Sequence, residues 1–386
     1  MIDKSLGFYT SGNLEFDSKI SACIYATQNN LDVSWEFHKD VFDNYPWSIE
    51  PTKTLDELYD KRARELREKY DYIMVSYSGG ADSHNLVMAF LRQNLFIDEI
   101  VVNHLQKGME NYKPPLPGDF SAENALQTEF LFQTMPRLKE IEKMSPKTKI
   151  SIFDLTDYLF DFLNTANDGS WILNKREKLN PINITRFNYL YFSEVRKQFD
   201  KDKKIAVVMG VEKPRLIIDP KTNDLWMRFT DAAANIVSVV ADHMKDYPNA
   251  SIEYFYWHPD SAEMLCKQCH VVKRWLLTYP EKINYWTLGQ INKDIYRLMH
   301  ERVYRTLLYT TWDQNWFQAD KAVLDWYTEF DDWFINGYEN TKLHAIWLDG
   351  LNYVTKEASN FIVESKGKPD GLRMLGQNHK ICNLYL

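Results

Sequence analysis

The residues with the clearest capacity for chemistry form one short segment, Ser-Gly-Gly-Ala-Asp-Ser at positions 78–83. Adjacent glycines let the backbone turn sharply and approach a ligand closely, because neither has a Cβ atom. Consecutive backbone N–H groups in such a turn, followed by the start of a helix, form a site for an anion. The serines can donate hydrogen bonds to phosphate oxygens, and Asp82 is suited to bind Mg²⁺ directly or through water. The predicted phosphate-binding residues are Ser78, Gly79, Gly80, Ala81, Asp82 and Ser83.

The neighbouring sequence places this segment between a strand and a helix. Residues 72–77 are a short apolar run that is typical of a buried strand. After the glycines, apolar residues recur at helical spacing from Leu86 to Leu91. No Gly-Lys-Ser/Thr follows the glycines and no Gly-x-Gly-x-x-Gly is formed. The Walker loop and the dinucleotide fingerprint are therefore both excluded.

The complete motif in this strand–loop–helix context resembles the PP-loop, or N-type, ATP pyrophosphatases. Most members of that superfamily cleave ATP between the α and β phosphates to adenylate a substrate, whereas its phosphoadenylylsulfate reductases bind an already activated nucleotide. The resemblance covers about residues 70–215 and implies ATP and Mg²⁺ as cofactors, with Asp82 as metal ligand. It also implies that adenine lies near the end of the second strand, at Asn103 or His104.

A second group of candidate residues follows the apolar run 204–209. Gly210 frees the backbone at the carboxyl end of a strand, where open α/β sheets bind their ligands. Lys213 and Arg215 are predicted to face the phosphates and to stabilise charge on the departing pyrophosphate. The alternative is that both are solvated cations on a loop. The predicted catalytic residues are Asp82, Lys213 and Arg215.

Two familiar members of the superfamily do not match. Glutamine-dependent asparagine synthetases have a cysteine directly after the initiator methionine, where this chain has Ile2, and an amidotransferase domain would not fit before residue 70. Sulfate reductases use a cysteine in a C-terminal Glu-Cys-Gly-Leu-His tail. Cys382 stands near the end of this chain without those neighbours, and only His379 and Lys380 could favour its thiolate.

The sequence Cys266-Lys-Gln-Cys269-His270 allows two interpretations. On a helix, its sulfur and nitrogen atoms could converge on zinc, with a fourth ligand from elsewhere. Alternatively, Cys269 belongs to an apolar stripe at helical spacing and is a small core residue. We favour the stripe, which consists of Leu265, Cys269, Val272 and Leu276.

Short apolar strands, at 99–104, 149–154 and 204–209, alternate with helical segments. This alternation predicts an α/β fold with a doubly wound and mostly parallel sheet. The resemblance implies that this sheet is of the adenine nucleotide alpha-hydrolase-like type. A capping box at Thr54 predicts a helix to about Lys69, and 215–229 has the pattern of a hairpin. We expect an N-terminal extension at 1–70, the ATP-binding domain at 71–258 and a mainly helical domain at 259–386, which ends in an irregular tail.

The composition and charge limit the classes of partner that the protein could bind. The formal net charge is −8 with no long basic block, which argues against nucleic acid. No signal peptide is visible at the start, and the most apolar window, 232–241, is too short to span a bilayer. The four cysteines are too few for a disulfide scaffold, so we expect a cytoplasmic protein without a membrane partner. An oligomer remains possible.

The leading hypothesis is an ATP pyrophosphatase that adenylates an acceptor substrate for attack by a nitrogen nucleophile. A sulfur-chemistry enzyme, reductase-like or thiolating, is the first alternative, and a nucleotide-binding protein without turnover is the second. In composition the chain looks like PP-loop proteins of tailed bacteriophages, which are labelled phosphoadenylylsulfate-reductase-like or asparagine-synthase-like.

Overall fold

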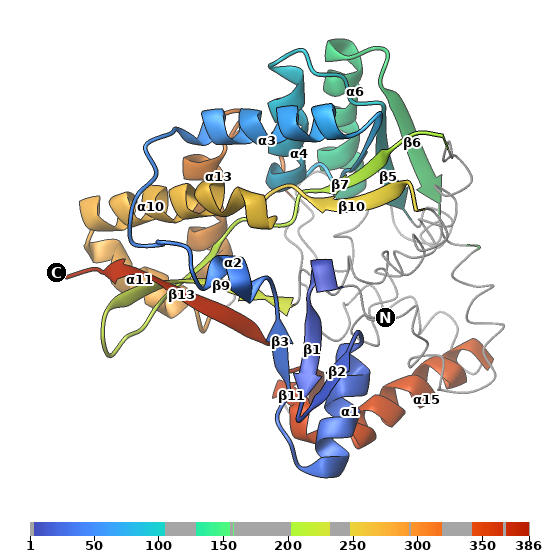
Figure 1. The fold of residues 1–386 in the computed structure, drawn as a ribbon, viewed down its shortest axis with the longest axis vertical. Coiled ribbons are helices and arrows are strands. Elements are labelled where there is room, and N and C mark those ends of the chain that lie inside the picture. The colour runs from blue at the N-terminus through green and yellow to red at the C-terminus, as the bar shows by residue number, and fades with distance from the viewer. Residues whose placement is uncertain are drawn as a thin grey trace.

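The centre of the molecule is a five-stranded parallel sheet with the order β10-β7-β4-β5-β6 (Figure 1). The computed structural model describes residues 4–104, 129–154, 157, 202–231, 248–292, 295–318, 342–365 and 368–385. Successive strands are added on one side of β4 and then on the other, so the strand order reverses beside β4, as in doubly wound sheets. The strands are β4 (Tyr72–Ser76), β5 (Glu99–His104), β6 (Lys149–Asp154), β7 (Ile205–Met209) and β10 (Ala250–Tyr254). The predicted α/β class and the four predicted strands are confirmed.

Continuous apolar sequence explains why these segments form the inner strands. All five residues of β7 are buried, as are the three central residues of β4. Strands of parallel sheets are covered on both faces, so they lack the alternation of half-exposed strands. The pairing of Ser76 with Met209 brings the carboxyl ends of β4 and β7 to the same level.

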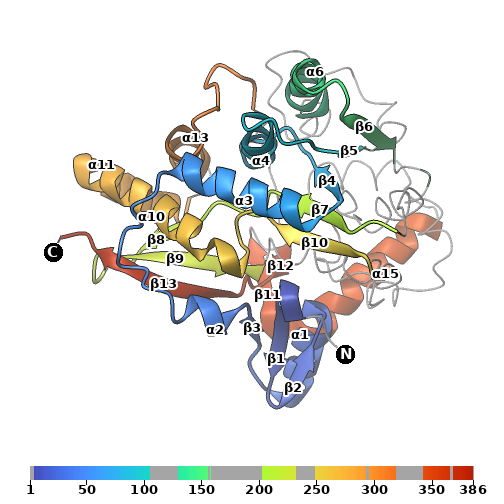
Figure 2. The same cartoon turned by 45° about the horizontal axis from the view of Figure 1, so that its top comes forward.

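Helices precede or follow the strands of this sheet in the described part of the chain. α3 (Leu55–Lys69) begins at the predicted capping box, in which the Thr54 hydroxyl accepts from Glu57 N and the Glu57 carboxylate accepts from Thr54 N. α4 (Ala81–Leu91) follows β4 and lies beside α3 (Figures 1 and 2). The π-helix η4 (Glu129–Thr134) continues into α6 (Met135–Met144), which precedes β6.

Smaller antiparallel sheets complete the fold. The predicted hairpin is formed by β8 (Arg215–Ile218) and β9 (Asp224–Thr230), with Asn223 in the left-handed region at φ +58°. Its third strand is β13 (Gly376–Asn383), which pairs with β9. The other strands are β1 (Phe8–Ser11), β2 (Leu14–Phe16) and β3 (Ser34–Glu36), which form one sheet, and β11 (Ile362–Ser365) and β12 (Lys368–Leu372), which form another.

The expected irregular tail was wrong, because the described residues after Phe361 form β11, β12 and β13. Along β13 the side chains alternate between buried and exposed, with Gln377, His379 and Ile381 directed inward. Two of these three residues are polar, so hydropathy alone does not reveal the strand.

Several helices lie between β10 and β11 in the described part of the chain. The longer ones are α10 (Ala262–Thr278), α11 (Glu281–Gly289), η8 (Tyr296–Glu301), α13 (Arg302–Leu308) and α15 (Lys342–Glu357).

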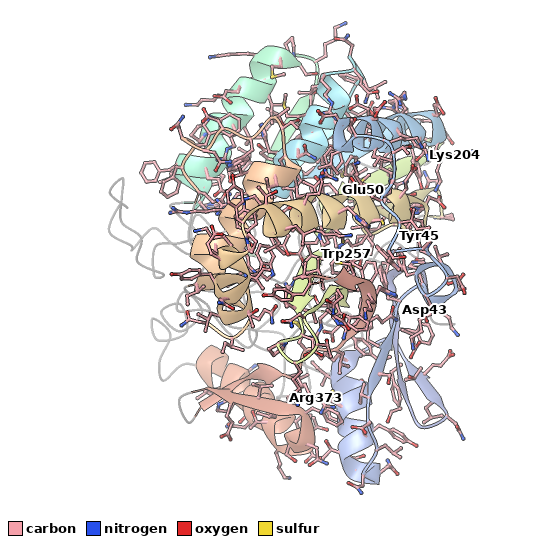
Figure 3. All side chains as sticks on the ribbon, turned by 90° about the vertical axis from the view of Figure 1, so that its left-hand side faces the viewer. Asp43, Tyr45, Glu50, Lys204, Trp257 and Arg373 are labelled. Carbon is pink, nitrogen blue, oxygen red and sulfur yellow. The ribbon has the colours of Figure 1, made fainter. Side chains whose placement is uncertain are left out.

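Residues from all three predicted domains share one apolar core. Trp257, labelled in Figure 3, is fully buried and contacts Phe37 from the N-terminal range and Phe229 from β9. Glu50 lies beside α10, where it accepts from Lys267 and Arg274. The domain boundaries at 70 and 258 remain predictions.

The described part of the chain contains no helix that is both long enough and apolar enough to cross a bilayer. The apolar window 232–241 lies outside the described residues.

Candidate phosphate-binding site

The predicted loop connects β4 to α4, and its backbone requires glycine at position 79. Gly79 has φ +71°, in the left-handed region. A Cβ atom there would lie 2.7 Å from the Thr134 Cα atom, which is closer than real Cβ contacts allow. Gly80 is the N-cap of α4 with extended backbone angles. The loop therefore turns sharply against η4 and enters the helix directly.

Residues of η4 and α6 hold the loop carbonyl groups from outside. Thr134 Oγ1 donates to Ser78 O at 2.8 Å, and Gln133 Nε2 donates to the same oxygen at 3.2 Å. The Arg137 guanidinium donates to Gly79 O. Because these carbonyls are already bonded to donors, the loop is held in one conformation.

The first turn of α4 supplies donors for an anion. The N–H groups of Ala81, Asp82 and Ser83 begin the helix and have no acceptor within it. The positive end of the helix dipole lies at the same place. A strand–loop–helix unit of this kind can bind phosphate oxygens with backbone groups alone.

The two serines mainly hold the loop in shape. Ser83 Oγ donates to Gly80 O at 3.2 Å and accepts from Ser78 N at 3.3 Å. Ser78 Oγ accepts from Gly80 N at 3.3 Å. Ser83 is buried whereas Ser78 is exposed, so of the two hydroxyl groups that of Ser78 is the more accessible to a ligand.

Gly210 lies against this first turn, as expected for a residue that follows the strand next to β4. A Cβ atom on Gly210 would lie 3.1 Å from both the N and Cα atoms of Ser83. The carboxyl ends of β4 and β7 flank the point where the strand order reverses, which is where open α/β sheets bind ligands. The structure therefore brings residues 78–83 and Gly210 together at the expected edge of the sheet.

Asp82 and Lys213 form an ion pair at this edge, with 3.2 Å between Lys213 Nζ and Asp82 Oδ2. Burial opposes the charge of Lys213, but Asp82, Glu301 and Glu212 outweigh it and hold the pKa of the ammonium well above its ordinary value. Lys213 Nζ lies 3.4 Å from Glu301 Oε2 and 3.9 Å from Glu212 Oε1. Lys213 is thus a buried, charged group beside the loop and not a solvated cation.

Arg215, the other predicted cation, contacts Glu212 and has no ion pair with Asp82. Its Nη2 atom is 3.8 Å from Glu212 Oε2, and its Nη1 atom donates to Met374 Sδ at 3.5 Å. These partners belong to the β7–β8 connection and to the segment before β13, outside the phosphate loop.

Asn103 and His104 end β5 beyond the last residue of β4 that pairs with it, Ser76. Asn103 is exposed. The His104 ring stacks on Phe130 of η4 with 3.9 Å between ring centroids, and burial lowers the pKa of His104 to about 4. The neutral His104 ring therefore packs against η4, the short helix whose other end holds the Ser78 carbonyl.

Sequence reasoning missed the aromatic residues that contact Asp82 and Arg137. Tyr309 OH donates to the Asp82 carboxylate, and Tyr256 OH donates to Asp82 O at 2.9 Å. Arg137 lies over the rings of Trp312 and Trp316, at 4.3 and 4.9 Å from the centroids. These residues are far apart in the sequence, and no local motif indicates that they meet.

Asp82 is the residue that was predicted to bind magnesium, and its carboxylate already contacts Lys213 and Tyr309. Its side chain is 24% exposed, and it supplies the carboxylate oxygen that Mg²⁺ prefers. Among the described residues no group of three or more His, Cys, Asp or Glu side chains could hold a metal. Mg²⁺ in nucleotide sites usually takes one or two carboxylates and completes its coordination with substrate phosphates and water, so a single carboxylate is sufficient.

The cysteines are arranged as core residues. On α10 the stripe of Leu265, Cys269, Val272 and Leu276 is fully buried, which confirms the core interpretation. The Cys266 Sγ atom donates to Ile49 O at 3.4 Å, and the His270 ring bonds to Trp47 O at 3.0 Å. These atoms are bonded to backbone carbonyls instead of facing one another.

Cys382 also lacks the surroundings of a catalytic thiol. Burial raises the pKa of its thiol, and the nearby Lys380 is paired with Asp224 at 2.7 Å. Burial lowers the pKa of His379, so the neighbouring imidazole is neutral at pH 7. Lys273 and Lys380 lower the pKa of the thiol, but burial outweighs them, so a thiolate is not favoured.

We expect the native protein to resist thiol reagents. Burial raises the pKa of Cys23 and Cys266 to about 12, and it also raises the pKa of Cys269 well above its ordinary value. Titration with a chromogenic disulfide at about pH 8 should modify at most Cys382 quickly and the other three only after denaturation. Rapid modification of Cys266 or Cys269 in the folded protein would contradict this arrangement.

No protein-family model matches the chain, and no curated protein matches its sequence significantly. The function therefore has to be inferred from the geometry of the site.

Proposed function

We propose that the chain is a PP-loop ATP pyrophosphatase with an adenine nucleotide alpha-hydrolase-like fold. It binds the phosphates of ATP at residues 78–83 and cleaves the bond between the α and β phosphates, so that an acceptor substrate becomes adenylated and is then attacked by a nitrogen nucleophile. The observation that carries this proposal is the glycine turn at Gly79, held from outside by η4 and leading directly into α4 at the reversal point of the sheet.

Each part of the site has a role in this reaction. Backbone N–H groups at the start of α4 bind phosphate oxygens, and the Ser78 hydroxyl adds a further donor. Lys213 provides a positive charge next to Asp82, where negative charge accumulates on the departing pyrophosphate. Mg²⁺ held by Asp82 would supply further charge neutralisation when bound. In-line displacement at the α phosphate needs positioning and charge stabilisation more than covalent participation by the protein.

The adenine would lie toward the end of β5. The planar His104–Phe130 pair offers an apolar aromatic surface there, and Asn103 offers amide hydrogen-bonding groups. A neutral His104 suits a neutral base better than a charged imidazolium would.

The sulfur-chemistry alternative has less support. It requires an accessible, activated cysteine, whereas burial raises the pKa of Cys266, Cys269 and Cys382. A binding protein without turnover would use the same loop, and only an assay of ATP cleavage separates it from the enzyme.

The test is to incubate the full chain with ATP carrying separate labels on the α and γ phosphates, together with Mg²⁺ and a pool of carboxylates and amines. AMP and pyrophosphate are the expected products. ADP and phosphate as products would refute the assignment. Tight ATP binding without cleavage in any pool would favour the alternative of a nucleotide-binding protein without turnover. Asp82→Asn should lower pyrophosphate release about 100-fold, since one charged ligand of the site is lost.

Asp60→Asn is the matched control. Asp60 is also a helical carboxylate paired with a cation, Arg92, but it lies on α3 outside the site. This variant should keep wild-type activity. If Asp82→Asn were as active as Asp60→Asn, the role of Asp82 would be wrong.

A further inference from the structure

The β8–β9 hairpin places two arginines side by side near the phosphate loop. Arg215 and Arg228 are direct partners in the antiparallel register, so their side chains leave the sheet on the same face. Cβ atoms of such partners lie about 5 Å apart, and like charges at this position destabilise a sheet. A bound anion near the two guanidinium groups would reduce this repulsion.

Arg228 has an anion near enough to raise its pKa, Asp231, but the two form no ion pair. The Arg228 Nε atom is buried and has no hydrogen-bond partner among the described residues. Asp231 could have served, but its carboxylate is bound to Lys19 at 2.8 Å and also accepts from Tyr9 OH and Leu375 N. Burial lowers the pKa of Arg228, and the charge of Arg215 lowers it further. A buried guanidinium N–H without an acceptor costs free energy that a bound oxyanion would recover.

The backbone leaves room for this arginine. A Cβ atom on Gly376 of β13 would lie 3.0 Å from Arg228 Nε and 2.2 Å from Phe229 O. Any other residue at position 376 would push against both atoms. The glycine thus lets β13 pair with β9 while the guanidinium stays on the sheet.

The arginine pair lies next to the proposed nucleotide site. Glu212 is within 4 Å of both Lys213 and Arg215, and Lys213 contacts Asp82. One carboxylate therefore separates the arginine pair from the cation beside the phosphate loop. A substrate held by the pair could reach a nucleotide held by the loop.

We propose that Arg215 and Arg228 form a subsite for an oxyanion, a carboxylate or a phosphate-type group, carried by the second substrate. Paired guanidinium forks bind either group through charge-assisted, bidentate hydrogen bonds. The assignment to the second substrate rests on the proposed function, whereas the subsite itself does not.

The experiment measures the melting temperature of the full chain in low millimolar sulfate, in acetate and in chloride at equal ionic strength. The melting temperature of the wild type should rise at lower concentrations of sulfate or acetate than of chloride. Arg228→Gln and Arg215→Gln should each need about tenfold more of the anion to reach the same rise in melting temperature. In chloride, Arg228→Gln should be at least as stable as wild type because the repulsion is removed, whereas a purely structural arginine would leave the variant less stable. Arg274→Gln, which removes an exposed arginine on α10, is the charge-matched control and should behave as wild type.

Binding of a fluorescent ATP analogue to the same variants identifies the occupant. Unchanged ATP affinity in Arg228→Gln supports the second substrate. An equal loss of ATP binding and of the anion response would overturn that assignment in favour of the nucleotide's own phosphates. An anion response in wild type that Arg228→Gln retains would overturn the subsite, as would the absence of any response. A protein that responds to sulfate through Arg228 but does not bind ATP would refute the proposed function and leave the subsite intact.

Discussion

Gly79→Ala is expected to abolish nucleotide binding, with at least about a 100-fold loss of affinity, and to destabilise the fold by about 2–4 kcal/mol. Left-handed backbone costs a non-glycine residue about 1–2 kcal/mol. The new methyl group would also lie 2.7 Å from Thr134 Cα, and backbone cannot move aside as a flexible side chain can. The loop would have to leave η4, and the hydrogen bonds from Thr134 and Gln133 to Ser78 O would break.

Two measurements check this prediction, urea unfolding and titration with a fluorescent ATP analogue. Gly12→Ala is the matched control, since Gly12 also has positive φ, at +56°, but its added Cβ would meet only the end of the Leu31 side chain. That variant should lose stability modestly and bind nucleotide normally. If Gly79→Ala bound nucleotide as well as Gly12→Ala, the loop would not be the phosphate site.

Lys213→Met is expected to destabilise the protein by about 3–5 kcal/mol near neutral pH. The ammonium is the shared partner of Asp82, Glu301 and Glu212, and its removal leaves three partly buried carboxylates without their common cation. Pyrophosphate release should fall as well, because the same cation lies beside the phosphate loop.

The pH dependence of this loss has a definite sign. Lys213 has a raised pKa, so its contribution is complete below the ordinary lysine value and disappears only in strong alkali. Burial opposes ionisation of Glu301, but Lys213 and Arg305 hold its pKa below the ordinary value. In the variant this pKa rises, and protonation relieves the repulsion. The gap between wild type and Lys213→Met should therefore narrow as the pH falls from about 7 to about 4.

Denaturant unfolding at several pH values measures this gap. Lys380→Met is the control, because it removes a lysine that pairs with Asp224 at 2.7 Å but is half exposed. Its effect should be much smaller and should show little of the pH dependence. A pH-independent loss in Lys213→Met would mean that packing of the lysine stem, and not its charge, matters.

Local rules were sufficient to predict four of the five strands in the central sheet, whereas β10 was missed. The apolar runs of β4, β5, β6 and β7 are visible without any tertiary information, and Thr54 with Glu57 marks the start of α3. Glycine at 79 is also a local requirement, since the turn between strand and helix needs it whatever surrounds it. Gly210 could be assigned to the phosphate site because parallel strands place their carboxyl ends at the same edge of the sheet.

The rest of the site depends on contacts between distant segments. Arg137 lies on α6, and nothing in the sequence indicates that this helix packs against the phosphate loop. The contact between Arg137 and the Gly79 carbonyl arises only in the tertiary fold. Tyr309 and Trp312 follow α13 and show no pattern that differs from core residues. β13 was missed because Gln377 and His379 face inward, where hydropathy predicts apolar side chains.

The pairing of β13 with β9 also sets an order of assembly during translation. A ribosome releases β8 and β9 well before Gly376, and a two-stranded hairpin alone is only marginally stable in water. The face that carries Arg215 and Arg228 therefore gains its third strand only after α10, α11, α13 and α15 have been synthesised. Completion of this face is a late, long-range step, in contrast to the loop between β4 and α4, whose two flanking elements are adjacent in the chain.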